Sequence, residues 1–397
     1  AAVADAGFHA EFAVCLDGDA DWKEWVGDVS APPTDVELDA ANDLLAIIYT
    51  SGTTGNPKGA MLTHANLAAN TWSTSRALQL RPLEDRVLVV LPMFHSFAAT
   101  VGMLSSLLFG VSFIPVPKFD PELVVSSIER HGASLFLGVP SMYNVLLRLP
   151  EGANDRLKSL RLCVSGGAAM PVEILRRFEE RYGVGVHEGD GPTECSPVTC
   201  INPVDGERKP GTVGPPVPLV EMRICDEHGK TLPDGEVGEI CVRGPNIMKG
   251  YWNLPEATEE SFFDDWFRTG DLGTRDADGY FSIVDRLKDM IIVNGMNVYP
   301  RMVEEVLYAH ESIREAAVVG EAHESHGEIP VAYVAAVEGQ TLDEKGLRIF
   351  CKERLGAHQM PRRFVILDDL PKNATGKIMK RELRREGELE RGIDIKR

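Results

Sequence analysis

The sequence predicts an α/β protein. We expect a large N-terminal domain of parallel-rich sheets with packed helices, a small β-rich subdomain within it, and a smaller α+β C-terminal domain. Short apolar runs alternate with amphipathic segments in the first half, and glycine and proline turns separate short alternating runs from 211 to 284. A second, shorter series of strand and helix patterns follows. At 397 residues the chain is long enough for two or three such units.

Short β-rich runs are the expected strands of the large domain, and the first of them is expected to be a buried strand. Two amphipathic helices are expected between them, at 120–132 and 170–183. Asp120 is a candidate N-cap with Pro121 at the first helical position, and Gly183 follows the second helix. The expected strands are 44–50, 86–92, 111–116, 134–140, 160–166 and 183–189.

One apolar stretch, residues 87–116, is long enough to suggest a membrane span. Pro92, Gly102 and Gly110 interrupt it. Such breakers favour a short strand, a turn, a buried helix and a second strand, all within a folded domain.

The later part of the chain reads as two further units. The 211–284 region, with turns such as "DEHG" and "LPDGE", predicts antiparallel hairpins. The final unit is expected to contain a hairpin at Asn294–Gly295, helices at 300–310 and 342–355, strands at 313–320, 330–337 and 362–368, and a helical tail that frays.

Composition limits the classes of partner and the compartment. The net charge of −19 argues against non-specific binding to nucleic acid. The seven cysteines form no C-x-x-C pair and their number is odd, which disfavours a zinc site or a disulfide framework. Reduced thiols fit a cytoplasmic location, and the first residues carry no basic segment of a signal peptide.

The stretch "YTSGTTGNPKGAMLTHANL" (49–67) combines glycines, hydroxyl side chains and Lys58. Glycine-rich backbone, hydroxyl donors and a lysine charge suit phosphate oxygens. The order Lys58-Gly59-Ala60 after Pro57 is not that of a Walker A loop, which needs Gly-Lys-Ser/Thr. Taken alone, the stretch could equally be an ordinary surface loop.

Several further segments follow this loop in a fixed order. They are "LPMFHSF" (91–97), "SGGAAMP" (165–171), "GPTE" (191–194), "GEICVRGPNIMKGYWN" (238–253), "WFRTGDLG" (266–273), "DRLKDMIIVNGMNVYP" (285–300) and "LPKNATGKIMKREL" (370–383). Together with the loop they resemble the motifs of the adenylate-forming superfamily, which comprises acyl-CoA and aryl-CoA synthetases, peptide-synthetase adenylation domains and beetle luciferases. The resemblance covers Asp43 to Leu383.

The resemblance implies a reaction in two halves. A carboxylate attacks the α-phosphate of ATP to give an acyl adenylate and pyrophosphate, and a thiol, usually coenzyme A, then displaces AMP. ATP, Mg²⁺, coenzyme A and a small carboxylic acid are the implied ligands, with no nucleic acid. The segments "EGDGPTECSPV" and "GPNIMKGYWNLPEAT" are most similar to bacterial medium- or long-chain fatty acyl-CoA synthetases. Peripheral membrane contact and a homodimer stay open.

By the same resemblance, the loop and the "GPTE" motif would hold the triphosphate. Glu194 is the implied Mg²⁺ ligand, because a hard cation bridging phosphate oxygens suits a carboxylate. Thr193 would contact the α-phosphate. The residues expected around the β- and γ-phosphates are Thr50, Ser51, Gly52, Thr53, Thr54, Gly55 and Lys58.

The nucleoside half has its own implied residues. Asp271 would accept hydrogen bonds from both ribose hydroxyls, since a carboxylate offers two acceptor oxygens, and Arg286 would be a second ribose contact. The residues expected near the adenine are Gly166, Gly167, Ala168, Gly189, Asp190 and Gly191.

Lys377 matches the catalytic lysine of the family, which bridges the attacking carboxylate and the α-phosphate. His95 matches a position between the acyl pocket and the thiol tunnel, although a lone histidine in an apolar run is more often a packed core residue. The implied division is an N-terminal adenylation domain at 1–284, a hinge at 285–288 with Lys288 as its pivot, and a mobile C-terminal lid at 289–397. The lid would bring Lys377 and the hairpin at Gly295 to the site in turn.

Three departures from the family pattern stand out. Asp190 occupies a position that is usually aromatic and stacks on adenine, and Ile292 occupies one where some relatives have a lysine. The phosphate loop also starts near residue 50, whereas full-length relatives have more chain before it, so we expect the N-terminal domain to lack its first part.

The acid itself is less defined by the sequence. The expected acyl pocket is small or apolar, and no charged residue is placed to bind an amino acid's ammonium group. An aryl-CoA ligase, an acyl-AMP ligase or adenylation domain that loads a carrier protein, and a non-catalytic remnant remain as alternatives. The expected pocket residues are Phe97, Leu137, Gly138, Val139, Met142, Tyr143, Val164 and Gly189.

Overall fold

The computed structural model describes residues 37–50, 57–373 and 375–390, with side-chain surroundings up to residue 385. The chain divides into two compact units, Ala1–Asp39 and Ala40–Arg397. Only residues 37–39 of the first unit are described, and they have no regular structure; a turn begins at Ala40. The second unit carries the fold discussed below.

A six-stranded sheet forms the centre of the large domain, in the order β4-β3-β5-β6-β7-β8. All pairs are parallel except β7 with β8. The predicted parallel sheet is confirmed, with most strands shorter than their apolar runs. Its strands are β3 (Arg86–Val89), β4 (Ser112–Pro115), β5 (Leu135–Gly138), β6 (Leu162–Ser165), β7 (Val186–Asp190) and β8 (Cys200–Ile201).

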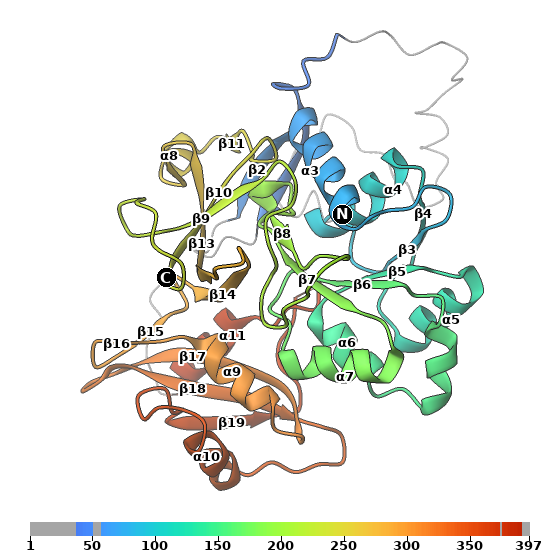
Figure 1. The fold of residues 1–397 in the computed structure, drawn as a ribbon. Helices are drawn as coiled ribbons and strands as arrows, with labels where there is room; N and C mark the ends of the chain where they lie inside the picture. The colour runs from blue at the N-terminus through green and yellow to red at the C-terminus, as the bar shows by residue number, and fades with distance from the viewer. Residues whose placement is uncertain (1–36, 51–56, 374, 391–397) are drawn as a thin grey trace, which may run out of the picture. The chain divides into compact units, whose positions relative to one another are not determined.

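Helices cover this sheet, with α3 on one face and α6 and α7 on the other (Figure 1). Asp120 caps α5 by accepting a hydrogen bond from Leu123 N, and Gly183 ends α7 in the left-handed conformation, as the sequence predicts. The helical segments are α3 (His64–Ala77), a π-helical turn (Ala98–Leu104), α4 (Ser105–Leu108), α5 (Pro121–His131), α6 (Pro140–Leu146), a 3₁₀ segment (Glu151–Leu157), α7 (Val172–Tyr182) and a 3₁₀ turn (Thr193–Cys195).

The 87–116 stretch folds as predicted into β3, the short helical segments and β4. In the part of the chain that the structure describes, no helix combines the length and the apolar character that a bilayer crossing requires.

Two antiparallel sheets complete the large domain. The first strand, β1, was predicted to be buried, but its side chains alternate between partly buried and exposed, and Leu45, Ile47 and Tyr49 are exposed. The reason is that β1 lies at the edge of a three-stranded sheet and is not covered by helices on both faces. That sheet contains β1 (Leu44–Thr50), β2 (Lys58–Thr63) and β11 (Gly250–Tyr251). The other contains β9 (Glu221–Cys225), β10 (Gly238–Arg243), β12 (Phe262–Phe263), β13 (Trp266–Arg275) and β14 (Phe281–Arg286), with α8 (Pro255–Glu259) beside it.

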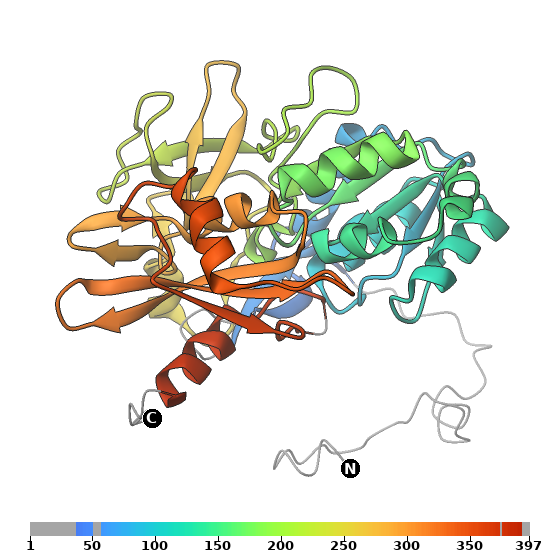
Figure 2. The same ribbon diagram turned by 90° about the horizontal axis from the view of Figure 1, so that it is seen from below.

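The small domain is an α+β unit, as predicted, with apolar clusters on both faces of its sheet. The predicted hairpin is present: Asn294 and Gly295, with φ of 51° and 78°, form the two-residue turn between β15 and β16. Figure 2 shows α11 beside this sheet, where Leu383 packs on β17. Its elements are β15 (Ile291–Val293), β16 (Met296–Val298), α9 (Pro300–Tyr308), β17 (Ile313–His323), β18 (Gly327–Ala336), α10 (Glu344–Lys352), β19 (Arg363–Leu367) and α11 (Lys380–Glu390).

Candidate active site

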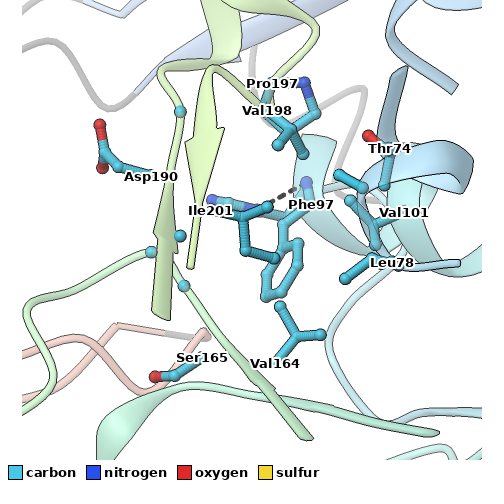
Figure 3. Close-up of a pocket in the computed structure, with 16 residues that line it drawn as sticks. Thr74, Leu78, Phe97, Val101, Val164, Ser165, Asp190, Pro197, Val198 and Ile201 are labelled. Atoms are coloured by element: carbon cyan, nitrogen blue, oxygen red, sulfur yellow. Dashed lines mark hydrogen bonds between the residues drawn. The ribbon is translucent and has the colours of Figure 1, made fainter. Parts of the chain in front are cut away.

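A pocket lies at the carboxyl ends of β6 and β7, where parallel sheets usually bind ligands. Figure 3 shows Phe97, Val101, Val164 and Ile201 around it, with Asp190 on the neighbouring strand. The cavity measures about 40 Å³, room for a few water molecules. An acyl group would therefore enter only if these side chains move. The walls are mostly apolar, which suits a hydrocarbon or an aromatic ring.

Glycines allow a close approach of backbone beside this pocket. A Cβ added to Gly191 would lie 1.8 Å from Pro197 O, and one added to Gly189 would lie 2.8 Å from Cys200 O. Only glycine fits at these positions without movement of the chain. The end of β7 and the loop at 196–198 therefore form one closely packed wall.

Helix α3 holds that loop through a buried amide. Asn70 Nδ2 donates to Val198 O at 2.7 Å and to Cys195 O at 3.3 Å, and Val198 N donates back to Asn70 Oδ1 at 3.2 Å. Thr74 and Leu78, one and two turns further along, line the pocket. The polar side chains of α3 are thus part of the wall of the site.

Asp271 and Arg286 are directly opposite each other on β13 and β14. Arg286 Nε donates to Asp271 Oδ1 at 3.1 Å, and Asp271 is buried. The charge of Asp271, which outweighs the effect of burial, raises the pKa of Arg286. One oxygen of the Asp271 carboxylate is therefore held by the guanidinium.

Asp190 is close enough to this pair to be affected by both members. Burial and then the negative charge of Asp271 raise its pKa to about 6, and Arg286 opposes the shift. Asp190 is therefore mainly ionised at neutral pH, at a position where the sequence already departs from the family pattern.

Lys377 belongs to the small domain, and the charges of Arg286, Asp271 and Asp190 affect it. Arg286, followed by burial, lowers its pKa to about 8, whereas Asp271 and Asp190 act in the opposite direction. Gly376, at φ +82°, turns the chain just before it, and Gly376 O accepts a hydrogen bond from Ser141 Oγ at 3.2 Å. Asn373 Oδ1 accepts from Lys377 N at 3.0 Å. The peptide group between Gly376 and Lys377 is thus held at both its oxygen and its nitrogen.

His95 lies near enough to Lys377 to be affected by its charge. Burial and then Lys377 lower the pKa of His95, so the imidazole is neutral at pH 7. Its Nδ1 accepts a hydrogen bond from Phe97 N at 3.3 Å. This contact fixes the ring beside a pocket-lining residue.

Glu194 and Thr193 form a second group with the end of the phosphate loop. Tyr251 Oη donates to Glu194 Oε1 at 2.7 Å, and Lys58 Nζ lies 4.9 Å from the centre of the Tyr251 ring. Thr50 is paired with Lys58 across β1 and β2. Thr193 Oγ1 is 3.2 Å from Ser96 Oγ. Tyr251 therefore links the glutamate to the loop lysine.

Of the predicted nucleotide residues, Gly166, Gly167, Gly189, Asp190 and Gly191 line the pocket, whereas Asp271, Arg286, Thr50 and Lys58 do not. Gly295 and Ala168 do not line the pocket, and Asn294 next to Gly295 binds His326 within the small domain. Ser51, Gly52, Thr53, Thr54 and Gly55 lie outside the described residues. Among the described residues, no group of three or more acidic, histidine or cysteine side chains gathers as a metal site.

The predicted acyl pocket needs a larger correction. Phe97, Val164 and Gly189 line the pocket. The others belong to the core or to its edge: Tyr143 is fully buried and donates to Val164 O at 2.8 Å. Side chains of α3 and β8 take their place, and the i, i+4 pair Thr74 and Leu78 was the signal that sequence reasoning missed. The residues that do not line the pocket are Leu137, Gly138, Val139, Met142 and Tyr143.

The large domain has a pocket at the end of a parallel sheet, and the small domain carries a lysine whose charge interacts with the pocket residues His95 and Asp190. This combination defines a two-domain nucleotide-binding enzyme fold. The profile of the AMP-binding enzyme family matches residues 4–252, and that of the AMP-binding enzyme C-terminal domain matches 302–377. The chain belongs to the AMP-binding enzyme family.

Its relatives act on different acids. A long-chain-fatty-acid–CoA ligase of Bacillus subtilis (strain 168) is 42% identical over 349 residues, which cover 87% of this chain and 62% of the ligase. A feruloyl-CoA synthase of an Amycolatopsis species is 40% identical over 363 residues, which cover 88% of this chain and 73% of the synthase. The chain thus spans less than two thirds of the length of the Bacillus relative.

Solved structures agree in fold. The ATP-bound crystal structure of MatB from Rhodopseudomonas palustris aligns with a TM-score of 0.83 at 39% identity, covering 90% of this chain and 70% of that one. The anthranilate CoA ligase AuaEII in complex with anthranoyl-AMP also gives 0.83, at 31% identity, covering 91% and 71%.

Proposed function

We propose that the protein is an AMP-forming acid–CoA ligase. A carboxylate oxygen attacks the α-phosphorus of ATP, pyrophosphate leaves, and the acyl adenylate forms; the thiol of coenzyme A then attacks the acyl carbon, and AMP leaves. The observation that carries the proposal is the position of Lys377, whose charge interacts with Arg286, Asp271 and Asp190 of the large domain and with His95.

Each group has a task in the first half-reaction. The Lys377 ammonium stabilises the negative charge that passes from the carboxylate to the α-phosphate. The second oxygen of Asp271 would accept from the ribose hydroxyls, and Thr193 would contact the α-phosphate. Neutral His95 adds no charge that would compete with Lys377 for the carboxylate. Positioning and charge neutralisation are what this chemistry requires.

Glu194 fits a magnesium ion that is held mainly by the nucleotide. Mg²⁺ usually takes one or two carboxylates together with phosphate oxygens, and Glu194 is a single carboxylate beside the phosphate loop. When bound, the ion would neutralise phosphate charge. Tyr251, as donor to Glu194 Oε1, would orient that carboxylate.

The apolar pocket supports an acid with an apolar tail, and we propose a fatty acid as the first candidate, in line with the Bacillus relative. An aryl acid is the second candidate. The feruloyl-CoA synthase relative and the ring of Phe97 on the pocket wall favour it.

The test is ATP–pyrophosphate exchange by the full chain with octanoate, palmitate and 4-coumarate, followed by coenzyme A addition. We expect exchange with at least one acid, followed by acyl-CoA formation.

Lys377→Ala should abolish exchange and spare thioester formation from supplied acyl adenylate. Equal loss of both half-reactions would contradict the role of Lys377. Exchange without acyl-CoA would indicate a carrier-protein acceptor, and no exchange with any acid would indicate a non-catalytic remnant.

A further inference from the structure

The start of α9 in the small domain makes a buried contact with the large domain through Arg301. Its side chain is only 11% exposed. The backbone N–H donates to Asp285 Oδ2 at 2.8 Å, and Nη1 donates to Ile283 O at 2.7 Å. Nη2 lies 3.6 Å from Glu188 Oε1. One side chain therefore reaches both β14 and β7.

Glu188 is a buried carboxylate, 2% exposed, two residues before Asp190 on β7. Its Oε1 accepts a hydrogen bond from Met170 N at 2.9 Å, and its Oε2 has no hydrogen-bond partner among the described residues. Burial raises its pKa to about 7; Arg301 opposes the shift, and Glu305 and Asp190 add to it. Arg301 is thus the positive charge that favours the ionised form of a carboxylate in the core.

This contact links the placement of the small domain to the strand that borders the pocket. The same small domain carries Lys377, and β7 carries Asp190. A second residue of α9 supports the alignment: Glu305 Oε2 accepts a hydrogen bond from Val172 N, at the start of α7, at 3.3 Å. If α9 moves away from β7, Glu188 loses its opposite charge inside the core, and an unpaired buried charge is costly.

We propose that Arg301 is a positioning residue which, by pairing with Glu188, holds the small domain where Lys377 reaches the pocket. The pair forms for adenylate formation and breaks when the small domain moves for thioester formation. This inference rests on the proposed function.

The test uses the full chain with Arg301→Gln, Glu188→Gln and the double variant. Glu188→Gln keeps an oxygen for Met170 N and removes the charge with almost no change in side-chain size. Each single change should lower ATP–pyrophosphate exchange about 5- to 150-fold, the usual range for a coupling between two sites. Thioester formation from supplied acyl adenylate should stay within about twofold of wild type, because that step does not use the pair. The double variant should be no worse than the poorer single variant, since neither charge is left unpaired.

Arg354→Gln is the matched control, because the Arg354 side chain hydrogen-bonds to Glu353 and to Phe350 O and lies over the Phe350 ring, all within its own domain. It should leave both half-reactions unchanged. Equal losses in both half-reactions for Arg301→Gln, or no loss in exchange, would overturn the proposal.

Limited trypsin digestion without substrates gives a readout that does not depend on activity. Trypsin cleaves after Arg286 and Lys288 between the two domains. Arg301→Gln and Glu188→Gln should be cleaved there faster than either the wild type or the control Arg354→Gln, because the small domain is held less firmly. Unchanged digestion would count against the positioning role. If wild type shows no exchange with any acid, the proposed function fails, whereas the digestion still decides whether Arg301 holds the domain.

Discussion

The pKa of Lys377 depends on four charged neighbours, namely one arginine, one lysine and two carboxylates. Arg286 and burial lower its pKa to about 8, and Lys288 acts in the same direction. Asp271 and Asp190 raise the pKa and partly offset this shift. The charge of the proposed catalytic group is therefore set by the residues that would bind the nucleoside.

We predict an alkaline limit on adenylate formation. The ammonium form is the one that stabilises charge on the α-phosphate, so the exchange rate should fall about tenfold per pH unit above about pH 8. The measurement is the pH profile of kcat/KM for exchange. Lys377→Arg stays charged over this range, and whatever activity it retains should lack the alkaline limb. A limb that persists in Lys377→Arg would assign the titration to another group.

The same profile should move in Asp190→Asn. Asp190 raises the pKa of Lys377 by its negative charge, so its removal should shift the alkaline limb to lower pH. The asparagine keeps the size of the side chain. A shift to higher pH, or none, would show that Asp190 does not act on Lys377. The direction of the shift thus tests the closeness of these two residues without relying on the absolute rate.

At the scale of elements, the end of β7 has the tightest packing in the site. An added Cβ at Gly191 would meet Pro197 O at 1.8 Å and Pro197 C at 2.5 Å. Both are backbone atoms of the loop that Asn70 holds against α3. Neither strand nor loop can move aside without breaking contacts elsewhere.

Gly191→Ala should therefore destabilise the large domain by about 1–3 kcal/mol, the usual cost of overpacking, and weaken nucleotide binding. Thermal unfolding and ATP titration measure the two effects. Gly152→Ala is the control, because a Cβ added there meets nothing within 4 Å. An unchanged melting temperature in Gly191→Ala would show that this wall is more loosely packed than the structure indicates.

The sequence predicted the elements whose patterns are simple. The strands of the central sheet are short apolar runs, and the caps Asp120 and Gly183 follow local rules that no tertiary contact overrides. Helix α3 was not predicted, because its buried face is polar: Asn70 and Ser73 are almost fully buried. Their partners are backbone carbonyls far along the chain, such as Val198 O and Pro218 O, which no local pattern indicates.

The prediction of the acyl-pocket residues differs from the structure for a related reason. Residues such as Leu137 and Tyr143 are apolar and lie beside the site in sequence, so they read as pocket walls. In the structure they face into the core, where Tyr143 packs edge-on against Phe136 and Phe178. The side of a strand or helix on which a residue lies depends on packing, and a motif does not specify it.

At the scale of the whole molecule, the proposed reaction needs two arrangements of the small domain. The segment proposed as the hinge, 285–288, begins at the end of β14, where Asp285 and Arg286 still pair with β13. Leu287 N donates to Gly270 O at 2.9 Å, and Asp289 N and Met290 N donate to Arg286 O. Lys288 lies between these bonds and is exposed. A rotation at Lys288 would leave the pairing of β14 with β13 in place and move everything that follows.

Lys288→Pro should then block thioester formation more than adenylate formation, because proline fixes φ and limits rotation at that residue. Separate assays of pyrophosphate exchange and of coenzyme A transfer from supplied acyl adenylate give the two rates. Lys288→Ala removes the same side chain without restricting φ, so it should retain both steps and separates the backbone effect from loss of the ammonium group. The arrangement described here, with Arg301 on Glu188 and Lys377 near His95, would be the one that survives in the proline variant. If Lys288→Pro slows both half-reactions to the same extent, the small domain does not turn at this residue, and Arg301 must release it around another point of the chain.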